Sequence, residues 1–477
     1  MRTPRHLVPI FLVAAMVGAA ACSSDSSSGS TSAPPATSAA ATTDATTDAT
    51  TEGTSTPVTT AVPETTVSTE AETTSVETTD VETTVVDDST VDSTDESAPV
   101  STEPAGDDVL AGMQNVVETL ASDELNGRNN LTPDSDAAQE FLITQLAEFA
   151  QPLTPGATGS AAYRQIFAEG TNLVGMIPGS DLADQYVLVG AHYDHLGNDC
   201  RGNGTDDHIC NGATDNATGT AVALAIARAI ATDPVPPRRS VIIALWDAEE
   251  DGLLGSQAYV ANPLVPLAQT IAYVNFDIQG TNISPALRDV TVMVGTETGG
   301  PNLVDAALAA ADGSPLQTVP LSLLFGQGRS DHATFVGAGV PSVFFTDATP
   351  PCYHTVGDDA SIVDYPKLDE QEITAEALVR DLADTDDVPT FNGTAPPATY
   401  DDAVALNEII VQAQPDFVRF SDADRAVADK FVTDLGAIVA AGADAFDDAA
   451  VGTLLGGAVA IVRAWSNGEC DGFLEST

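Results

Sequence analysis

The chain has 477 residues, of which 70 are acidic and 16 are basic, so its formal net charge at pH 7 is −54. This balance excludes nucleic acids and anionic membrane surfaces as electrostatic partners, because binding to either requires a basic surface. The length allows one large domain, or a domain with an appendage, in addition to non-globular segments.

Residues 1–21 have the pattern of a secretory signal peptide. Arg2 and Arg5 precede an apolar stretch that is too short to span a membrane. The small residues before Cys22 resemble the cleavage site of a bacterial lipoprotein, in which this cysteine is lipidated, although Ala19 stands where leucine is usual. We therefore expect export to the cell surface with a lipid anchor at Cys22, and secretion by ordinary cleavage is the alternative.

Residues 22–106 consist almost entirely of Thr, Ser, Ala, Val, Pro, Glu and Asp, and contain no aromatic or basic residue. Such a segment buries too little apolar surface to offset the entropy of the chain. We expect a disordered spacer that holds a folded domain away from the cell surface.

Helical and strand-like patterns alternate from residue 107 to residue 385. Helical periodicity covers 109–150 in two pieces, the second beginning at Ser135 or Asp136. The strand-like runs are 172–177, 186–191, 240–246, 271–276, 290–295 and 341–346, and helix-like stretches cover 218–231 and 302–313. This alternation predicts an α/β fold, a three-layer α/β/α sandwich with a mixed, largely parallel central sheet.

Residues 386–477 form a predicted helical C-terminal extension. One helix is expected to begin at the capping residue Ser421. The stretch 448–465 is apolar, but its glycines and Arg463 make it a poor membrane span. We expect it to pack on the main domain.

Four cysteines remain when Cys22 is set aside. An even number in an exported protein favours disulfides. A bond between Cys200 and Cys210 would close a short loop and leave Cys352 to pair with Cys470, although three pairings are possible. Zinc ligation by thiolates is the alternative, but the chain has no C-x-x-C pair.

Metal-competent side chains follow three of the predicted strands. The strand-like runs lead, in chain order, to His192, to the adjacent Glu249 and Glu250, and to Asp277. In a parallel sheet, sites form beyond the carboxyl ends of the strands, so these side chains are expected at one edge.

Further candidates stand close to these in the sequence. Asp194 is two residues after His192 and faces the same way on an extended backbone. Asp215 lies in a glycine-rich turn before a helix, and His354 follows the last strand. Two histidines with three carboxylates suit zinc or a similar cation, and two such ions ~4 Å apart form a recurrent hydrolytic arrangement.

Six motifs in order resemble the di-zinc aminopeptidase family, metallopeptidase family twenty-eight, whose superfamily includes glutamate carboxypeptidase II and glutaminyl cyclase. The resemblance covers roughly residues 108–385 and implies the zinc-dependent exopeptidase fold. The motifs are GAHYDHLG (190–197), NGATDNATG (211–219), WDAEEDGLLGS (246–256), NFDIQG (275–280), SDHATFVGAGVPSVFFTD (330–347) and YHTVGDD (353–359).

The resemblance implies two Zn²⁺ per chain. By that likeness His192 and Asp277 bind one ion, Glu250 and His354 bind the other, and Asp215 bridges both.

The resemblance also implies the roles of the remaining motif residues. Glu249 would be the general base that takes a proton from the attacking water and passes it to the leaving amine. Asp194 would orient His192 through the other ring nitrogen. His332 would lie near the substrate carbonyl, and Tyr353 would help to stabilise the oxyanion.

The function expected from this set is a metallo-aminopeptidase acting on peptides as a monomer. Leu323, Leu324 and Phe325 are candidate walls of an apolar substrate pocket, or else part of a buried strand. Without a basic cluster, and with Arg329 alone nearby, neutral or hydrophobic N-terminal residues are expected as substrates. The alternatives are a zinc carboxypeptidase or dipeptidase of the same fold, a glutaminyl-cyclase-like enzyme, and a catalytically inactive surface-binding module.

Several polar residues near the motifs are expected to have no role at the site. His195 is interpreted as structural and His208 as exposed. Asp358 and Asp359 are interpreted as solvated surface charges.

Overall fold

The computed structural model describes residues 105–198, 200, 207–470, 472 and 473. All of them lie in the second of the two units into which the chain divides, Glu96–Thr477. The predicted signal peptide, the spacer and the lipidated Cys22 fall outside the described residues and stay predictions.

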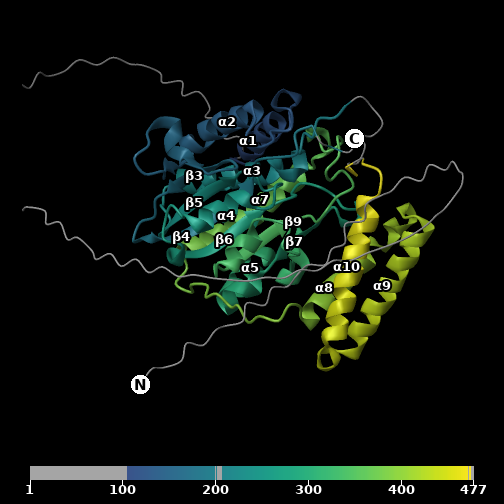
Figure 1. The fold of residues 1–477 in the computed structure, drawn as a ribbon. Coiled ribbons are helices and arrows are strands. Elements are labelled where there is room, and N and C mark those ends of the chain that lie inside the picture. Colours follow the sequence, from purple (N-terminus) through teal and green to yellow (C-terminus); the bar gives the residue numbers. More distant parts are fainter. Residues whose placement is uncertain (1–104, 199, 201–206, 471, 474–477) are drawn as a thin grey trace, which may run out of the picture. The chain divides into compact units, whose positions relative to one another are not determined.

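Strands and helices alternate along most of the described chain, as the sequence predicts (Figure 1). The strands are β1 (Gln151–Pro152), β2 (Arg164–Ile166), β3 (Thr171–Ile177), β4 (Leu182–His192), β5 (Arg239–Trp246), β6 (Thr270–Phe276), β7 (Val290–Val294), β8 (Gln317–Leu321) and β9 (Ser342–Thr346). The helices are α1 (Ala105–Leu120), α2 (Pro133–Phe149), α3 (Thr218–Thr232), α4 (Leu254–Ala261), α5 (Gly300–Asp312), α6 (His332–Gly337), α7 (Tyr365–Asp384), α8 (Tyr400–Ala413), α9 (Asp422–Ala441) and α10 (Asp448–Ser466).

The strands form one mixed sheet in the order β1-β3-β5-β4-β6-β9-β7-β8, with β2 paired to β3. Its centre is parallel, because β4 runs parallel to both β5 and β6, and β6 runs parallel to β9. The pairs β3–β5 and β7–β9 are antiparallel. The carboxyl ends of β4, β5, β6 and β9 therefore meet at one edge, which confirms the predicted sheet.

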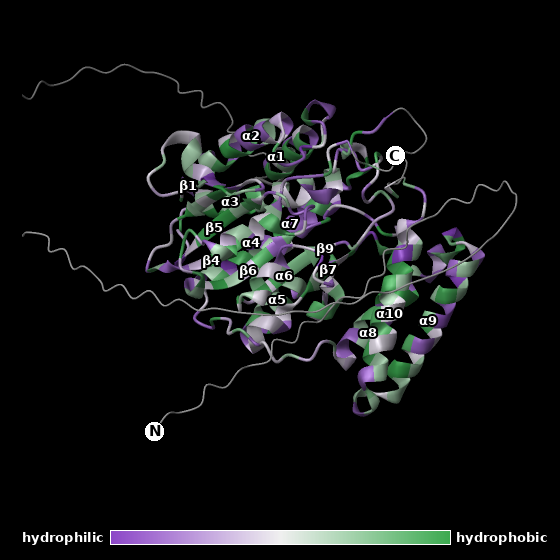
Figure 2. Cartoon of the chain, viewed as in Figure 1, coloured by the Kyte–Doolittle hydropathy of each residue, from purple (hydrophilic) through white to green (hydrophobic). Residues whose placement is uncertain are grey.

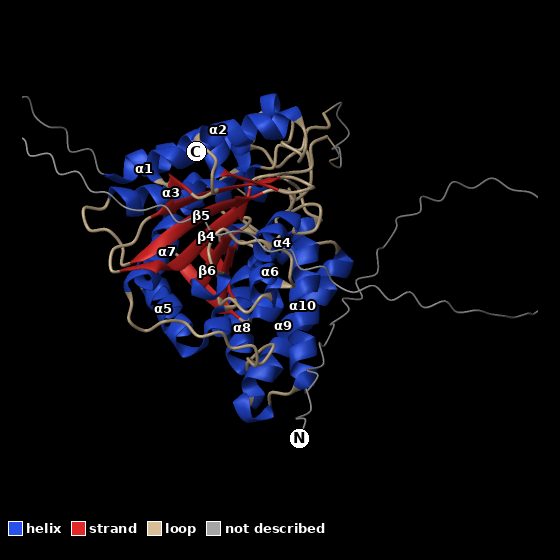
Figure 3. Cartoon of the chain, turned by 60° about the vertical axis from the view of Figure 1, so that its left-hand side comes forward, coloured by secondary structure: helices blue, strands red, loops and turns tan. Residues whose placement is uncertain are grey.

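Helices cover both faces of the sheet (Figure 3). Alternate residues of β5 point to opposite faces: Val241 and Ile243 join a core with α1, α2, α3, α5 and α7, whereas Ile242 and Ala244 join a core with α4 and α6. The central strands and α3 are mainly hydrophobic (Figure 2), as expected of elements buried on all sides. The predicted three-layer sandwich is confirmed.

The predicted C-terminal extension contains α8, α9 and α10. These helices share a third apolar core with side chains of β7, β8 and β9. Within the described part of the chain, α10 alone is long and apolar enough to cross a membrane, and 28% of its most apolar window is buried here. A disulfide joins Cys352 to Cys470, beyond the end of α10, and another joins Cys200 to Cys210, so both predicted pairings are confirmed.

Local signals explain where the predicted elements differ from the observed ones. Helix α2 begins at Pro133 rather than at Ser135, because the Thr132 hydroxyl accepts a hydrogen bond from the Ser135 amide. Ser421 does cap α9, as predicted. Strand β8 is absent from the predicted set because it contains Pro320, which a strand at the end of a sheet tolerates.

Candidate metal centre

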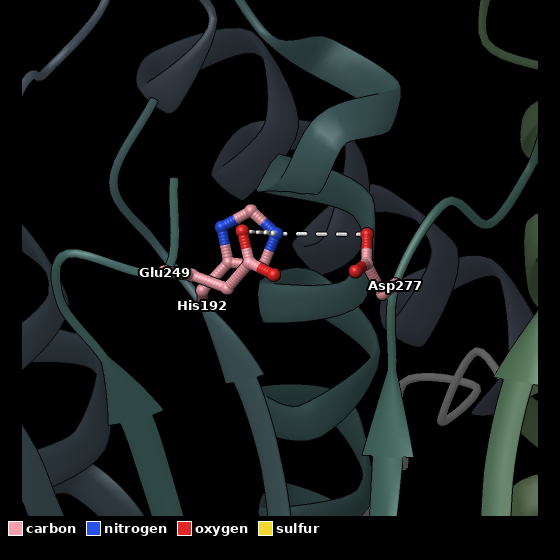
Figure 4. Close-up of side chains that lie close together, drawn as sticks. All are labelled: His192, Glu249 and Asp277. Carbon is pink, nitrogen blue, oxygen red and sulfur yellow. Dashed lines mark ion pairs between the residues drawn. The ribbon is translucent and has the colours of Figure 1, made fainter. Parts of the chain in front are cut away.

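Three side chains converge from the carboxyl ends of neighbouring parallel strands (Figure 4). His192 is the last residue of β4, Glu249 follows β5, and Asp277 follows β6. The Nε2 atom of His192 lies 3.5 Å from Asp277 Oδ1 and 4.0 Å from Glu249 Oε2. The ligand atoms of these three residues all lie within 4.8 Å of one another, which is close enough to surround one ion.

A second group of ligand atoms lies beside the first. It contains His195, Asp215 and Glu250, again within 4.8 Å of one another. His354 Nε2 also lies 3.1 Å from Asp215 Oδ2 and 3.2 Å from Glu250 Oε2. Asp215 Oδ1 is 3.3 Å from His192 Nε2, so this carboxylate touches both groups. That position is the one expected of a bridging ligand.

The donor atoms of both groups fit a cation. Among the described residues, these buried atoms have no hydrogen-bond partner outside the two ligand groups: His192 Nε2, both ring nitrogens of His195, Glu250 Oε1, Asp277 Oδ1 and His354 Nε2. Buried polar atoms are normally paired, because leaving one unpaired costs about 1–3 kcal/mol. Imidazole nitrogens and carboxylate oxygens that face each other unpaired are the ligands that zinc takes in proteins.

The carboxylates raise the pKa of the two histidines against the effect of burial. Burial lowers the pKa of His192, but the charges of Glu249 and Asp277 outweigh it and hold that pKa well above its ordinary value. Burial likewise opposes the charged form of His354, but contacts with Asp215 and Glu250 raise its pKa to about 10. The surroundings of both rings thus favour positive charge, which a metal ion would supply.

The adjacent glutamates have opposite pKa shifts. Burial and the charge of Asp215 would raise the pKa of Glu250, but contacts from His195 and His354 lower it to about 2. Burial raises the pKa of Glu249 well above its usual range, against the attraction of His192, and the charges of Asp277, Asp331 and Glu250 act in the same direction as burial. Glu250 is therefore held ionised, as a ligand must be, and Glu249 is able to hold a proton.

Asp194 organises the backbone and the ring around it. Its two carboxylate oxygens accept hydrogen bonds from the amides of Glu249 and Glu250, at 3.1 and 3.3 Å. Its Oδ1 also lies 3.5 Å from His192 Nδ1. The hydrogen bond of His192 Nδ1 is to the backbone carbonyl of Asp194, at 3.3 Å, so the orienting role of the Asp194 carboxylate stays a prediction.

Tyr353 and His332 lie in different surroundings. The Tyr353 ring stacks on His354 at 3.8 Å between centroids, and the Arg329 guanidinium lies 5.7 Å from the Tyr353 centroid. His332 is buried and stacks on Phe344, and burial lowers its pKa to about 3, so its ring is neutral. Its predicted position near the substrate carbonyl stays a prediction.

The candidate pocket wall is neither a strand nor wholly exposed. Leu323, Leu324 and Phe325 form a short 3₁₀ helix and are all half-buried. Phe325 packs against the core shared with α8–α10. The other two remain candidates for contact with substrate.

Three residues behave differently from the interpretation of the sequence, or were missed by it. His195, interpreted as structural, has its Nδ1 atom 2.7 Å from Glu250 Oε1, inside the second group. Asp358 is wholly buried and not a solvated charge, because it accepts hydrogen bonds from the amides of Thr214 and Asp215. Asp331, overlooked although it lies in the SDHATF motif, is buried with both carboxylate oxygens unpaired among the described residues, and burial raises its pKa to about 7.

The sequence of this chain is similar to a family of peptidases and to several of its members. Residues 172–379 match the profile of Peptidase family M28. The chain is 30% identical over 208 residues to "Probable glutamate carboxypeptidase LAMP1" of Arabidopsis thaliana, covering 41% of this chain and 28% of that protein. It is 38% identical over 113 residues to "Aminopeptidase NAALADL1" of Mus musculus, covering 23% of this chain and 13% of that protein. This chain therefore spans less than a third of the length of these relatives.

Among solved structures, the aminopeptidase from Aneurinibacillus sp. strain AM-1 aligns with a TM-score of 0.46 and 15% identity. The alignment covers 60% of this chain and 96% of that chain.

Proposed function

Residues 172–379 are a domain of peptidase family M28, a family of zinc metallopeptidases, and from this premise we propose that the protein is an exported di-zinc aminopeptidase. The observation that carries the proposal is the pair of adjacent ligand groups joined by Asp215, the first of which contains Glu249 together with His192 and Asp277. Its substrates are peptides with neutral or hydrophobic N-terminal residues.

Five residues would hold the metal. His192 and Asp277 would bind one zinc ion, Glu250 and His354 the other, and Asp215 both. When bound, zinc supplies Lewis-acid polarisation of the scissile carbonyl and makes water more acidic. The contact between His195 and Glu250 adds a second imidazole to the half of the site that includes His354.

Glu249 would move the proton. Its carboxyl group has a raised pKa and lies 4.0 Å from His192 Nε2 within the first ligand group, so it can accept a proton from the attacking water and release it to the departing amine. Asp194 fixes the peptide groups of Glu249 and Glu250 through two hydrogen bonds. The two neighbouring side chains can therefore point in different directions and have different roles.

The charge of the site favours an amino group on the substrate. The carboxylates gathered here are Asp194, Asp215, Asp277, Asp331, Glu249 and Glu250. When all six are ionised, they carry more negative charge than two divalent zinc ions neutralise; when Glu249 and Asp331 hold the protons that their raised pKa values favour, the charges balance. In the ionised state an N-terminal ammonium group is attracted to the site, whereas a substrate carboxylate is repelled.

A carboxypeptidase-like activity is the second candidate. Arg329 is exposed beside Tyr353 and has no carboxylate partner among the described residues. One free guanidinium at this position could receive a substrate carboxylate. Several relatives carry the name glutamate carboxypeptidase, which is compatible with this alternative.

An assay with aminoacyl p-nitroanilides separates the two candidates. The purified protein is tested directly, after chelation, and after zinc is restored, beside Glu249→Gln. We expect zinc-dependent release that prefers Leu or Phe and is lost in Glu249→Gln. If protein containing two zinc ions releases nothing from any unblocked substrate, the aminopeptidase assignment is wrong, and C-terminally free, N-blocked peptides become the next substrates.

We further propose that the protein acts as a lipid-anchored monomer on the outside of a bacterial cell. The lipoprotein-like sequence around Cys22 and the acidic spacer that follows it support this proposal. Replacing Cys22 by serine should move the protein from the membrane fraction to the medium, and an unchanged membrane fraction would exclude the anchor. Size-exclusion chromatography with light scattering tests the monomer.

A further inference from the structure

A short segment, residues 211–215, lies between two buried charged side chains that belong to no ligand group. On one side, the Arg128 guanidinium donates hydrogen bonds to the carbonyl groups of Asn211, Gly212 (2.6 Å) and Asp215 (3.3 Å). Arg128 is wholly buried and lies in the turn before α2, outside the residues that match the family.

The Asp358 carboxylate holds the other side of this segment. It accepts hydrogen bonds from the Thr214 amide and hydroxyl, both at 2.8 Å, and from the Asp215 amide at 3.1 Å. Its backbone carbonyl accepts a further bond from the Ala213 amide at 3.0 Å. The peptide groups leading to Asp215 are thus bonded through their carbonyls to a cation and through their amides to an anion.

The same two residues reach the other ligand-bearing segments. Arg128 Nε donates to the carbonyl of Tyr193, the residue after His192, at 2.6 Å. Asp358 lies four residues after His354, in the same loop. The contacts of these two side chains therefore connect the segments that carry His192, Asp215 and His354, three of the five ligands proposed above.

Burial of these two charges is unfavourable unless their hydrogen bonds offset it. A buried ion loses several kcal/mol of hydration, and replacing such groups with apolar residues is often neutral or stabilising for a fold. The buried charges of Arg128 and Asp358 are therefore not explained by stability of the fold, but they are explained if the nearby ligands need them for correct positioning.

We propose that Arg128 and Asp358 are a positioning pair for the metal centre, which fixes the orientation of Asp215 relative to His192 and His354. The pair does not touch the reacting atoms. Its removal should lower metal affinity, because outer contacts of this kind set the geometry of ligands and their loss typically costs 10- to 100-fold in affinity. This inference rests on the ligand set of the proposed function.

The test is zinc affinity of the full chain, measured by competition with a fluorescent chelator, in Arg128→Lys and Asp358→Asn. Arg239→Lys is the matched control, because Arg239 is also buried and donates to the backbone carbonyls of Leu382 and Thr385, but at the start of β5 and away from the ligands. Thermal unfolding of the metal-free proteins is recorded beside the affinities.

We expect at least one zinc ion to bind about 10- to 100-fold more weakly in both variants, and within about twofold of wild type in Arg239→Lys at a comparable loss of unfolding temperature. Wild-type zinc affinity in both variants, with lowered unfolding temperatures, would show a structural role only and overturn the proposal. If Arg128→Lys does not fold, the nearly isosteric Asp358→Asn decides the question alone.

A double variant tests the claim that the residues act as a pair. Because both hold the same segment, the combined loss of affinity should be smaller than the product of the single losses. Independent, multiplicative losses would contradict the pairing. Zinc binding needs no substrate, so failure of zinc-loaded wild type to cleave peptides would refute the proposed function without deciding this inference.

Discussion

The candidate metal centre has a strand half and a loop half, and different parts of the molecule hold each half in place. His192, Glu249 and Asp277 stand at the ends of buried parallel strands, and their side chains are at most 10% exposed. His354 lies in an irregular loop, has a left-handed backbone (φ 56°) and is 27% exposed. The strand half is held by the sheet, whereas the loop half depends on two distant contacts, the bonds of Asp358 to residues 214–215 and the Cys352–Cys470 bond, and on the local stacking of Tyr353.

This difference predicts which property a substitution in each half will change. Changes in the strand half should affect chemistry and leave the fold intact, because the sheet supports the backbone. Changes in the loop half should affect metal binding and stability together. Five experiments test or sharpen this contrast.

The largest effect is expected for Glu249→Gln in the strand half. Loss of the proton acceptor should lower kcat about 10²- to 10⁴-fold and leave zinc content unchanged. Asp251→Asn is the control, since Asp251 is an exposed acid two residues further on. Loss of zinc in proportion to activity would instead make Glu249 a ligand.

Removal of the Cys352–Cys470 bond should destabilise the loop half. In the chain-entropy view, a bond between residues 118 positions apart stabilises by about 5 kcal/mol, and one between residues 10 apart, such as Cys200–Cys210, by about 3 kcal/mol. Denaturant unfolding of the two double-serine variants measures the difference. If Cys352→Ser/Cys470→Ser unfolds like wild type and keeps both zinc ions, the loop half does not depend on this bond.

The stability of the fold is expected to depend on pH through Glu372, a buried residue outside both halves of the metal centre. Glu372 in α7 is 3% exposed, and burial, with Glu376 and Asp369, raises its pKa to about 8. Because the unfolded carboxyl ionises near pH 4.5, the folded state binds the extra proton between pH 4.5 and 8, so stability falls as pH rises through this range.

Glu372→Gln should remove this dependence and exceed wild-type stability by about 1–3 kcal/mol at pH 8, with no such gain at pH 4. Urea unfolding at both pH values measures it, with the exposed Glu118→Gln as control. An equal change at both pH values would show that the ionisation of Glu372 is not the cause.

His195→Asn should weaken zinc binding about tenfold or more, because His195 contacts Glu250 at 2.7 Å. His208→Asn is a matched control, since His208 is exposed. Chelator competition compares the two, and equal affinities would return His195 to the structural role interpreted from the sequence.

The smallest effect is expected at Arg329. Arg329→Gln should raise the KM for Leu-Gly about two- to fivefold and leave the KM for Leu-Gly amide unchanged, because only the first substrate carries a carboxylate. Equal changes for both substrates would assign Arg329 to support of the Tyr353 ring instead.

The same contrast explains what the sequence could predict. His192 and Asp277 follow apolar runs at a sheet edge, so general rules for parallel sheets bring them together. The pairing of Asp215 with His354 came only from the family resemblance. Asp358 looked like a surface charge in GDD, because the amides that bury it belong to residues about 144 positions earlier. No local pattern carries that information, whereas β8 and the start of α2 were missed for local reasons, namely Pro320 within the strand and the Thr132 cap.

The contacts of Arg128 and Cys470 also determine how long a fragment of this protein must be to keep the metal centre intact. A fragment cut at residues 172–379 contains all five proposed ligands but leaves out both residues. It would lose the donor to the carbonyls of Tyr193, Asn211, Gly212 and Asp215, and leave Cys352 as a free thiol. The residues that match the family profile, 172–379, are therefore fewer than the residues that a fragment or fusion protein must contain to preserve these contacts.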